Sequence, residues 1–121
     1  MARIMFIDDD VITLEILGKA TEILGHQPIL LNAGRNAIDR VGELKPDMIM
    51  MDMMMPDMDG MAMLACLREQ AKTAAIPVVI LSAGKTPDDN QQVIDAGAQA
   101  YISKPISLVK LQDTIQRYTH I

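Results

Sequence analysis

The sequence has one cysteine and no long apolar run, and each of these features excludes a class of protein. Its only cysteine, Cys66, cannot form an internal disulfide, so a reducing, cytoplasmic setting is the simplest expectation. No apolar run approaches the roughly 20 residues that span a bilayer, so we expect no membrane segment. A strand pattern begins at Arg3, which predicts that no signal peptide is present. Cys66 itself lies in a helical pattern, where we expect a small buried residue.

An excess of basic residues is also missing, and the net charge is −5. Residues 1–60 contain eleven acidic and five basic residues, whereas residues 61–121 contain five acidic and six basic residues. No basic stripe is present to meet a phosphate backbone, so we expect no direct binding to nucleic acid. The acidity is instead concentrated in the first half of the chain.

Strand and helix patterns alternate five times along the 121 residues. Strands are predicted at Arg3–Ile7, Pro28–Leu31, Met48–Met51, Ile76–Leu81 and Ala100–Ser103. Helices are predicted at Val11–Leu24, Arg35–Leu44, Gly60–Lys72, from a start at Thr86-Pro87 to a stop at Gly97, and after a cap at Ser107. This alternation predicts an α/β fold with parallel strands, right-handed crossovers and helices on both faces. No linker, repeat or second domain is visible, so residues 1–121 are expected to form one domain.

The first predicted helix has an apolar stripe at helical spacing, which we expect to face the core. The stripe consists of Ile12, Ile16, Ala20 and Ile23.

Polar residues follow four of the predicted strands. Asp8-Asp9-Asp10 ends the first strand, Asp52 the third and Ser82 the fourth, and Lys104 closely follows the fifth. Because open α/β sheets bind ligands at the carboxyl ends of their strands, we expect these side chains to meet. Carboxylates, a hydroxyl and a lysine suit a divalent metal and a phosphoryl group.

At these residues the chain resembles the receiver domain of bacterial two-component response regulators. The resemblance covers essentially the whole chain and rests on four motifs: Ile7-Asp8-Asp9-Asp10, Asp52-Met53-Met54-Met55-Pro56-Asp57-Met58-Asp59-Gly60, Leu81-Ser82-Ala83 and Tyr101-Ile102-Ser103-Lys104-Pro105. It implies a flavodoxin-like, doubly wound (βα)5 fold with a five-stranded parallel sheet of order 2-1-3-4-5. It also implies a cytoplasmic signalling phosphoacceptor that promotes its own phosphorylation and dephosphorylation, rather than an ordinary enzyme.

The resemblance implies a role for each motif. Asp52 accepts the phosphoryl group, Ser82 hydrogen-bonds a phosphoryl oxygen, and Lys104 pairs with the phosphoryl group or with Asp52. Mg2+ is the implied cofactor, and its implied ligands are Asp8, Asp9, Asp52 and the backbone carbonyl of Met54.

Further expectations concern the switch and the partners. Ser82 and Tyr101 are the implied switch residues, and the Lys104–Pro105 bond is expected to be cis. The implied phosphodonor is a sensor histidine kinase or a histidine phosphotransfer protein. A downstream effector or output domain is expected on the face formed by the fourth helix, the fifth strand and the fifth helix. The resemblance leaves a homodimer open.

Two alternatives come from other classes. Asp8-Asp9-Asp10 also fits the nucleophile motif of haloacid dehalogenase-type phosphatases, with Asp8 as nucleophile and Asp10 as general acid. That interpretation lacks a late acidic pair after the lysine and leaves Asp52 unexplained, and Asp10 also fits a helix cap. The other alternative is an unphosphorylated interaction module, against which the intact acids and lysine argue.

Nine methionines between Met48 and Met63 could suggest a copper-binding tract, since thioethers suit soft metals. Their spacing follows strand and helix, which favours a role as core filler.

Overall fold

A central parallel sheet organises the computed structural model, which describes residues 1–82 and 87–119. Its strands are β1 (Arg3–Ile7), β2 (Gln27–Leu31), β3 (Met48–Asp52), β6 (Val78–Ser82) and β7 (Ala100–Ser103). They run in the order β2-β1-β3-β6-β7, and every neighbouring pair is parallel. This is the predicted order, since β4 (Met54–Met55) and β5 (Met58–Asp59) form a separate antiparallel hairpin.

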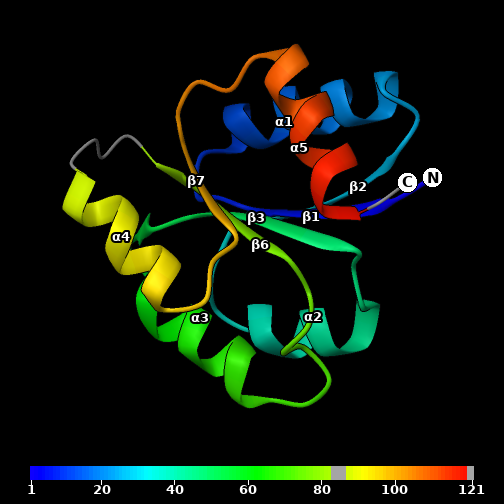
Figure 1. Cartoon of the computed structure of the whole chain (residues 1–121). Coiled ribbons are helices and arrows are strands. Elements are labelled where there is room, and N and C mark those ends of the chain that lie inside the picture. The colour runs from blue at the N-terminus through cyan, green and yellow to red at the C-terminus, as the bar shows by residue number, and fades with distance from the viewer. Residues whose placement is uncertain (83–86, 120–121) are drawn as a thin grey trace.

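Helices cover both faces of the sheet, as predicted. They are α1 (Val11–Ile23), α2 (Ala37–Leu44), α3 (Gly60–Glu69), α4 (Pro87–Asp95) and α5 (Leu108–Thr119). Figure 1 shows α1 and α5 on one face and α2, α3 and α4 on the other. The predicted third helix is shorter than expected, because Gln70 already has an extended backbone. Thr86, the predicted cap of α4, lies outside the described residues.

Two apolar clusters fill the two sides of the sheet. Ile4 and Phe6 of β1 pack with α1 and α5, whereas Met5 and Ile7 pack with α2 and α3. This alternation follows from the period of two along a strand, and both faces are covered, so β1 is apolar throughout. Met50 and Met51 of β3 are likewise buried on opposite sides, which agrees with methionine as core filler.

The inward face predicted for α1 is wrong for its three isoleucines, whereas Ala20 is partly buried against the core. Ile12, Ile16 and Ile23 are 67%, 63% and 76% exposed, and the buried residues of the helix are Leu14, Leu17, Gly18 and Thr21. The buried stripe is less apolar than the predicted one, but it includes the small residues Gly18 and Thr21. At this point α1 lies close to β2. A Cβ at Gly18 would lie 3.2 Å from Leu30 Cδ1. Thr21 is satisfied in this position because its hydroxyl donates to the carbonyl of Leu17 at 2.7 Å.

Cys66 also differs from expectation, since it is exposed rather than buried. The face of α3 toward the sheet consists of Gly60, Met63, Leu64 and Leu67. Cys66 lies outside this stripe and therefore points to solvent.

Glycine follows two of the helices, and the stop predicted at Gly97 is confirmed. Gly25 and Gly97 follow α1 and α4 with φ of 87° and 116°, a backbone region that glycine adopts without strain. Within residues 1–82 and 87–119, no helix has the length and apolar content needed to cross a membrane.

Candidate functional site

The strand register brings the predicted polar residues to one edge of the sheet. Ile7 lies opposite Met51, so Asp8 and Asp52 emerge side by side at the carboxyl ends of β1 and β3. Ser82 ends β6 opposite Ser103 of β7, one residue before Lys104. Asp8 is 2% exposed and Ser82 is 5% exposed, so both side chains are buried at this edge.

Three carboxylates form the centre of this edge. Asp8, Asp9 and Asp52 each offer an oxygen, and these oxygens all lie within 4.8 Å of one another. The three differ in burial, since Asp8 is buried, Asp52 is half-buried and Asp9 is exposed. An all-oxygen set with an open side fits Mg2+, which prefers carboxylates and retains several waters. Met54, the fourth predicted contributor, lies in β4 just beyond Asp52.

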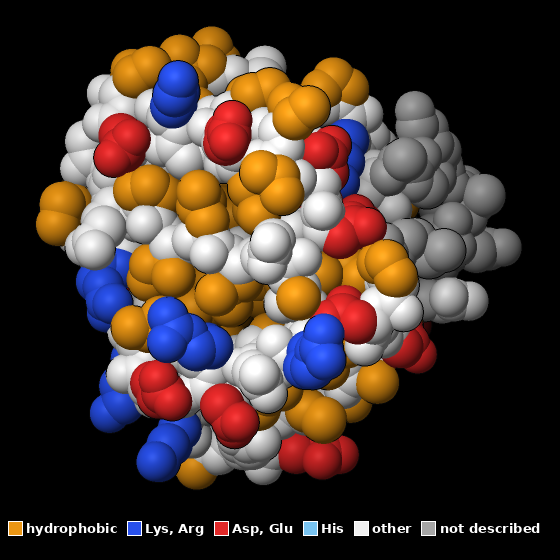
Figure 2. Space-filling view, turned by 180° about the vertical axis from the view of Figure 1, so that it is seen from behind, with side chains coloured by type: hydrophobic (Ala, Val, Ile, Leu, Met, Phe, Trp, Pro, Cys, Tyr) orange, Lys and Arg blue, Asp and Glu red, His pale blue; other side chains and the backbone are white. Residues whose placement is uncertain are grey.

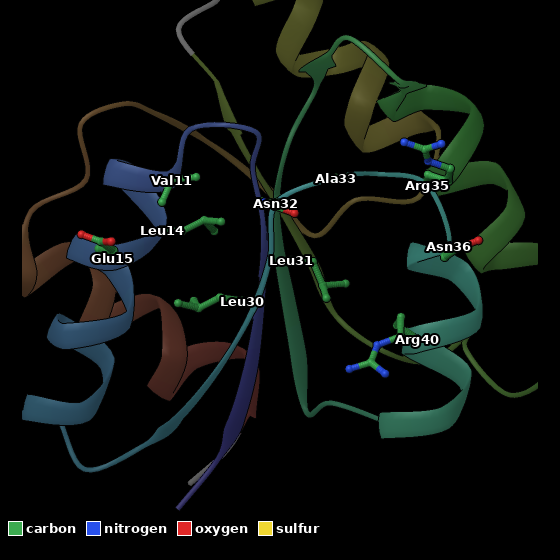
Figure 3. A pocket seen from close by; sticks show the side chains of 10 residues that line it. All are labelled: Val11, Leu14, Glu15, Leu30, Leu31, Asn32, Ala33, Arg35, Asn36 and Arg40. Carbon is green, nitrogen blue, oxygen red and sulfur yellow. The ribbon is translucent and has the colours of Figure 1, made fainter.

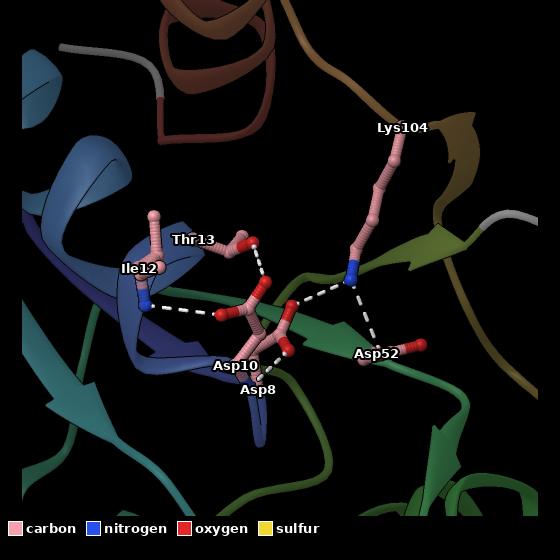
Figure 4. A network of polar contacts seen from close by, with 6 residues as sticks. All are labelled: Asp8, Asp10, Ile12, Thr13, Asp52 and Lys104. Atoms are coloured by element: carbon pink, nitrogen blue, oxygen red, sulfur yellow. Dashed lines mark hydrogen bonds and ion pairs between the residues drawn. The ribbon is translucent and has the colours of Figure 1, made fainter.

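Lys104 neutralises part of this negative charge. Its Nζ lies 2.6 Å from Asp8 Oδ2 and 3.1 Å from Asp52 Oδ2, and Figure 4 shows the side chain reaching across to both. Burial alone would lower the pKa of Lys104, but the hydrogen bonds and charges of the two carboxylates outweigh it and raise that pKa. The lysine therefore stays charged at neutral pH. Its bond to Pro105 is cis, as the resemblance implies.

Asp10 has a different role from its two neighbours. Its carboxylate accepts hydrogen bonds from Ile12 N at 3.0 Å and from the Thr13 hydroxyl at 2.8 Å, which caps α1 (Figure 4). The Thr13 bond is the main cause that lowers the pKa of Asp10. The backbone N–H of Asp10 donates to Asp8 Oδ1 at 2.9 Å, which helps to fix the orientation of the buried acid.

Comparison with known proteins identifies the family. The family model described as the response regulator receiver domain matches residues 4–116. The chain belongs to this family. The polar-differentiation response regulator DivK of Brucella ovis is 30% identical over 115 residues, which cover 95% of this chain and 94% of DivK.

Two solved receiver domains have closely similar structures. The receiver domain of the Francisella response regulator 1452 has a TM-score of 0.91 at 26% identity, covering 99% of this chain and 98% of the other. The beryllofluoride-activated NtrC4 receiver domain dimer, solved in solution, has a TM-score of 0.90 at 25% identity, covering 99% of this chain and 98% of the other. The flavodoxin-like fold predicted from the sequence is therefore confirmed.

Membership places this receiver domain in two-component signalling rather than among ordinary enzymes. The comparisons give no support to the dehalogenase-type phosphatase. The structure is also unfavourable to it, because Asp10, its general acid, is engaged as a helix cap.

The two predicted switch residues lie on adjacent strands of the receiver domain. Tyr101 of β7 lies opposite Ile80, two residues before Ser82 on β6. The tyrosine is half-buried and packs against the cluster that contains Met63 and Val93. The backbone carbonyl of Ser82 accepts from Lys104 N at 3.0 Å, so the serine and the lysine are held together across the strand ends.

Two acidic residues of the β4–β5 hairpin have structural roles. The Asp-Gly motif by itself predicts a tight turn at Asp57 and Asp59. Asp59 caps α3 by accepting from Met61 N at 3.0 Å. Asp57 instead accepts from two backbone N–H groups of a distant loop, those of Gly34 and Arg35. Asp59 preceding a helix is a local signal for a cap, whereas the partners of Asp57 lie too far away in the sequence to leave such a signal.

Proposed function

We propose that this receiver domain accepts a phosphoryl group on Asp52 from a sensor histidine kinase or a histidine phosphotransfer protein. Mg2+ would be held by Asp8, Asp9, Asp52 and the backbone carbonyl of Met54. The observation that carries this proposal is the convergence of three carboxylates and the Lys104 ammonium at one edge of the sheet. This is the arrangement needed to hold a phosphoryl group beside an ionised nucleophile.

In the transfer, an oxygen of Asp52 forms a bond to phosphorus while the bond from phosphorus to the donor's imidazole nitrogen breaks. The imidazole leaves with the bonding electron pair and takes a proton. Mg2+, when bound, supplies charge neutralisation at the phosphoryl oxygens. Lys104 can move from Asp52 to a phosphoryl oxygen while Asp8 still holds it nearby. Ser82 provides a neutral donor at the same strand ends, and its movement would make room for Tyr101 to turn inward.

Phosphorylation of the whole chain by acetyl phosphate with Mg2+ tests the proposal. Intact-mass spectrometry should show one added phosphoryl group, and fragment mapping should place it on the peptide that contains Asp52. A label on Asp8 would instead support the phosphatase alternative. A protein that gains no label with either acetyl phosphate or a phosphorylated phosphotransfer protein would be an interaction module only.

Saturating Mg2+ should stabilise the fold, because three close carboxylates repel one another until a cation binds. A ligand that binds only the native state at 100 times its Kd adds about 2.7 kcal/mol to the free energy of unfolding. Urea unfolding with Mg2+ and with EDTA measures this difference. Asp9→Asn is the informative variant, since Asp9 is exposed and its substitution should remove most of the Mg2+ effect while changing little in EDTA. Equal midpoints for wild type in both conditions would contradict the metal site.

The exposed apolar stripe of α1 is the surface that we propose for the phosphodonor. Its first half lies beside the acidic edge, because Ile16 lines a small groove of about 130 Å3 together with Lys104, Pro105 and Ile106. Figure 2, a view from behind, shows apolar side chains between charged ones over the surface of the molecule. On α1 itself, Ile12, Ile16 and Ile23 are each more than 60% exposed, and such exposed apolar side chains on one helix are typical of a protein contact.

Ile16→Ser should weaken the interaction with a protein donor. Loss of one buried apolar side chain at such a contact costs about 1.5–3 kcal/mol, so we expect KM for a phosphorylated phosphotransfer protein to rise at least tenfold. Transfer from acetyl phosphate should stay unchanged. Ile23→Ser is the matched control, since Ile23 is also highly exposed, at 76% against 63% for Ile16, but lies at the far end of α1. Equal KM values for the two variants would exclude this surface.

The strand β7 and the helix α5 border the proposed output surface. A groove of about 510 Å3 between β7 and α5 is lined by Tyr101, Lys110, Asp113 and Arg117, among others. We propose that α4, β7 and α5 contact an effector or output domain through this face, with Tyr101 as the switch. A homodimer belongs to the same proposal, because the similar NtrC4 receiver domain forms one.

The remaining parts of the proposal concern the domain organisation and the cellular location. One sheet with an apolar cluster on each side supports residues 1–121 as a single receiver domain. The single cysteine supports a cytoplasmic location, where disulfides are rare.

A further inference from the structure

The tip of the β4–β5 hairpin is bonded to a loop far away in the sequence. Asp57 Oδ1 accepts from Gly34 N at 3.2 Å, and Asp57 Oδ2 accepts from Arg35 N at 3.0 Å. Gly34 and Arg35 belong to the loop between β2 and α2, and Figure 3 shows this loop running from the end of β2 to the start of α2. These bonds favour the ionised carboxylate and lower the pKa of Asp57.

Close packing joins the same two segments. A Cβ at Gly34 would lie 2.5 Å from Met58 Cβ, so only glycine lets the loop approach the hairpin this closely. The base of the hairpin is also closed, since Gly60 N donates to the carbonyl of Met53 at 3.4 Å. A Cβ at Gly60 would lie 2.9 Å from Met53 Cα. The hairpin is therefore fixed at its base by its own backbone and at its tip by the β2–α2 loop.

Met54 lies between these two fixed points. Its strand, β4, pairs with β5 through only two residue pairs, Met54 with Asp59 and Met55 with Met58. So short an isolated ribbon is not stable in water by itself. The position of the Met54 backbone therefore depends on the contacts at the ends of the hairpin, and the bonds of Asp57 are the polar ones at its tip.

We propose that Asp57 is a positioning residue for the metal site, because it holds the hairpin against the β2–α2 loop and so fixes the backbone of Met54, two residues after Asp52. This inference rests on the proposed function, in which the Met54 carbonyl is a metal ligand. Coupling of this kind is reciprocal. Bound cation should therefore hold the hairpin in place and protect the amides of Gly34 and Arg35 from hydrogen exchange.

The experiment compares Asp57→Asn with Asp59→Asn in the whole chain. Both variants remove one negative charge from the same hairpin, and both residues line the same groove beside Asp9. Asparagine at position 59 keeps the helix cap. Asparagine at position 57 would place its NH2 group against one of the two backbone N–H donors, so one of the two hydrogen bonds to the β2–α2 loop would be lost. Any difference between the variants therefore reports the loop contact rather than the charge.

Calorimetric titration with Mg2+, and with Mn2+ as a second probe, should show about tenfold weaker binding for Asp57→Asn than for Asp59→Asn, since outer contacts of metal ligands have effects of this size. Amide exchange at Gly34 and Arg35 should slow when Mg2+ is added to wild type and to Asp59→Asn, but not to Asp57→Asn.

Failure of the proposed metal site and failure of the proposed role of Asp57 would give different results. A wild type that binds neither cation would overturn the proposed metal site itself. A wild type that binds Mg2+ while the two variants bind it equally would overturn the role of Asp57 alone. Asp57→Ala, which removes both acceptors with the same loss of charge, is the second variant, and thermal melting in EDTA establishes that each protein is folded. Equal cation affinity of folded Asp57→Ala and Asp59→Asn would again exclude the proposal.

Discussion

Asp52→Asn should abolish phosphorylation by acetyl phosphate and by a protein donor. The amide oxygen is neutral and a poor nucleophile, and the substitution also removes one carboxylate from the proposed Mg2+ site. Loss of a nucleophile together with its charge lowers the rate by at least about a thousandfold, so the label should fall below detection. The fold should survive, because Asp52 ends β3 at a half-buried position and asparagine has the same shape.

Asp10→Asn is the matched control for this prediction. It removes a charge two residues from Asp8, but asparagine still caps α1 and Lys104 keeps both of its partners. We expect this variant to be labelled close to the wild-type rate. Labelling of Asp52→Asn at the wild-type rate would show that the acceptor lies elsewhere, and loss of label in Asp10→Asn alone would favour the phosphatase interpretation.

Arg68→Ala should cause a large loss of stability. The guanidinium of this α3 residue donates to the carbonyl of Gly97 at 2.9 Å, to the carbonyl of Ile76 at 2.9 Å and to Gln99 Oε1 at 3.0 Å. Longer bonds reach the carbonyls of Thr73 and Ala74 at 3.4 and 3.2 Å. One side chain thus joins α3 to the segments before β6 and before β7.

Hydrogen bonds from a charged group contribute about 1.5–3 kcal/mol each and are not additive, so we expect a loss of about 3 kcal/mol in the free energy of unfolding. Burial lowers the pKa of Arg68, yet an arginine remains charged at neutral pH. Arg68→Lys should recover only part of the loss, because an ammonium group cannot reproduce the planar fork. Urea unfolding of the wild type, Arg68→Ala and Arg68→Lys measures these differences in the free energy of unfolding. Lys72→Ala, at an exposed position nearby, should change stability by less than about 0.5 kcal/mol. Equal effects of Arg68→Ala and Lys72→Ala would contradict this account.

The strand order and the acidic edge were predictable because their signals are local. Each inner strand is an apolar run that ends in a polar side chain, and parallel strands bring such ends together. The face of α1 was not predictable in this way, since the helix has two stripes and the more apolar one is exposed. The buried stripe contains Gly18, where a Cβ would lie 3.2 Å from Leu30 Cδ1, so α1 packs closely against β2 at this point.

Contacts between residues far apart in the sequence could not be predicted, for a different reason. Arg68 meets Gln99 across 31 positions, and Asp57 meets Arg35 across 22. Neither pair leaves a periodic or local pattern in one sequence. The same holds for Gly34, whose small size is explained only when Met58 is seen against it.

The lysine of the acidic edge has a consequence for how the molecule is completed during synthesis. Lys104 lies 96 positions from Asp8 and 52 from Asp52, and it follows β7, which joins the sheet at its edge. A nascent chain that ends before this residue already carries all three acids, but it lacks the ammonium group that contacts Asp8 and Asp52 in the folded protein. Asp52 thus obtains its lysine partner only when the last strand has docked. Under the proposed function, a chain that ends before Lys104 would lack the cation beside its phosphoacceptor.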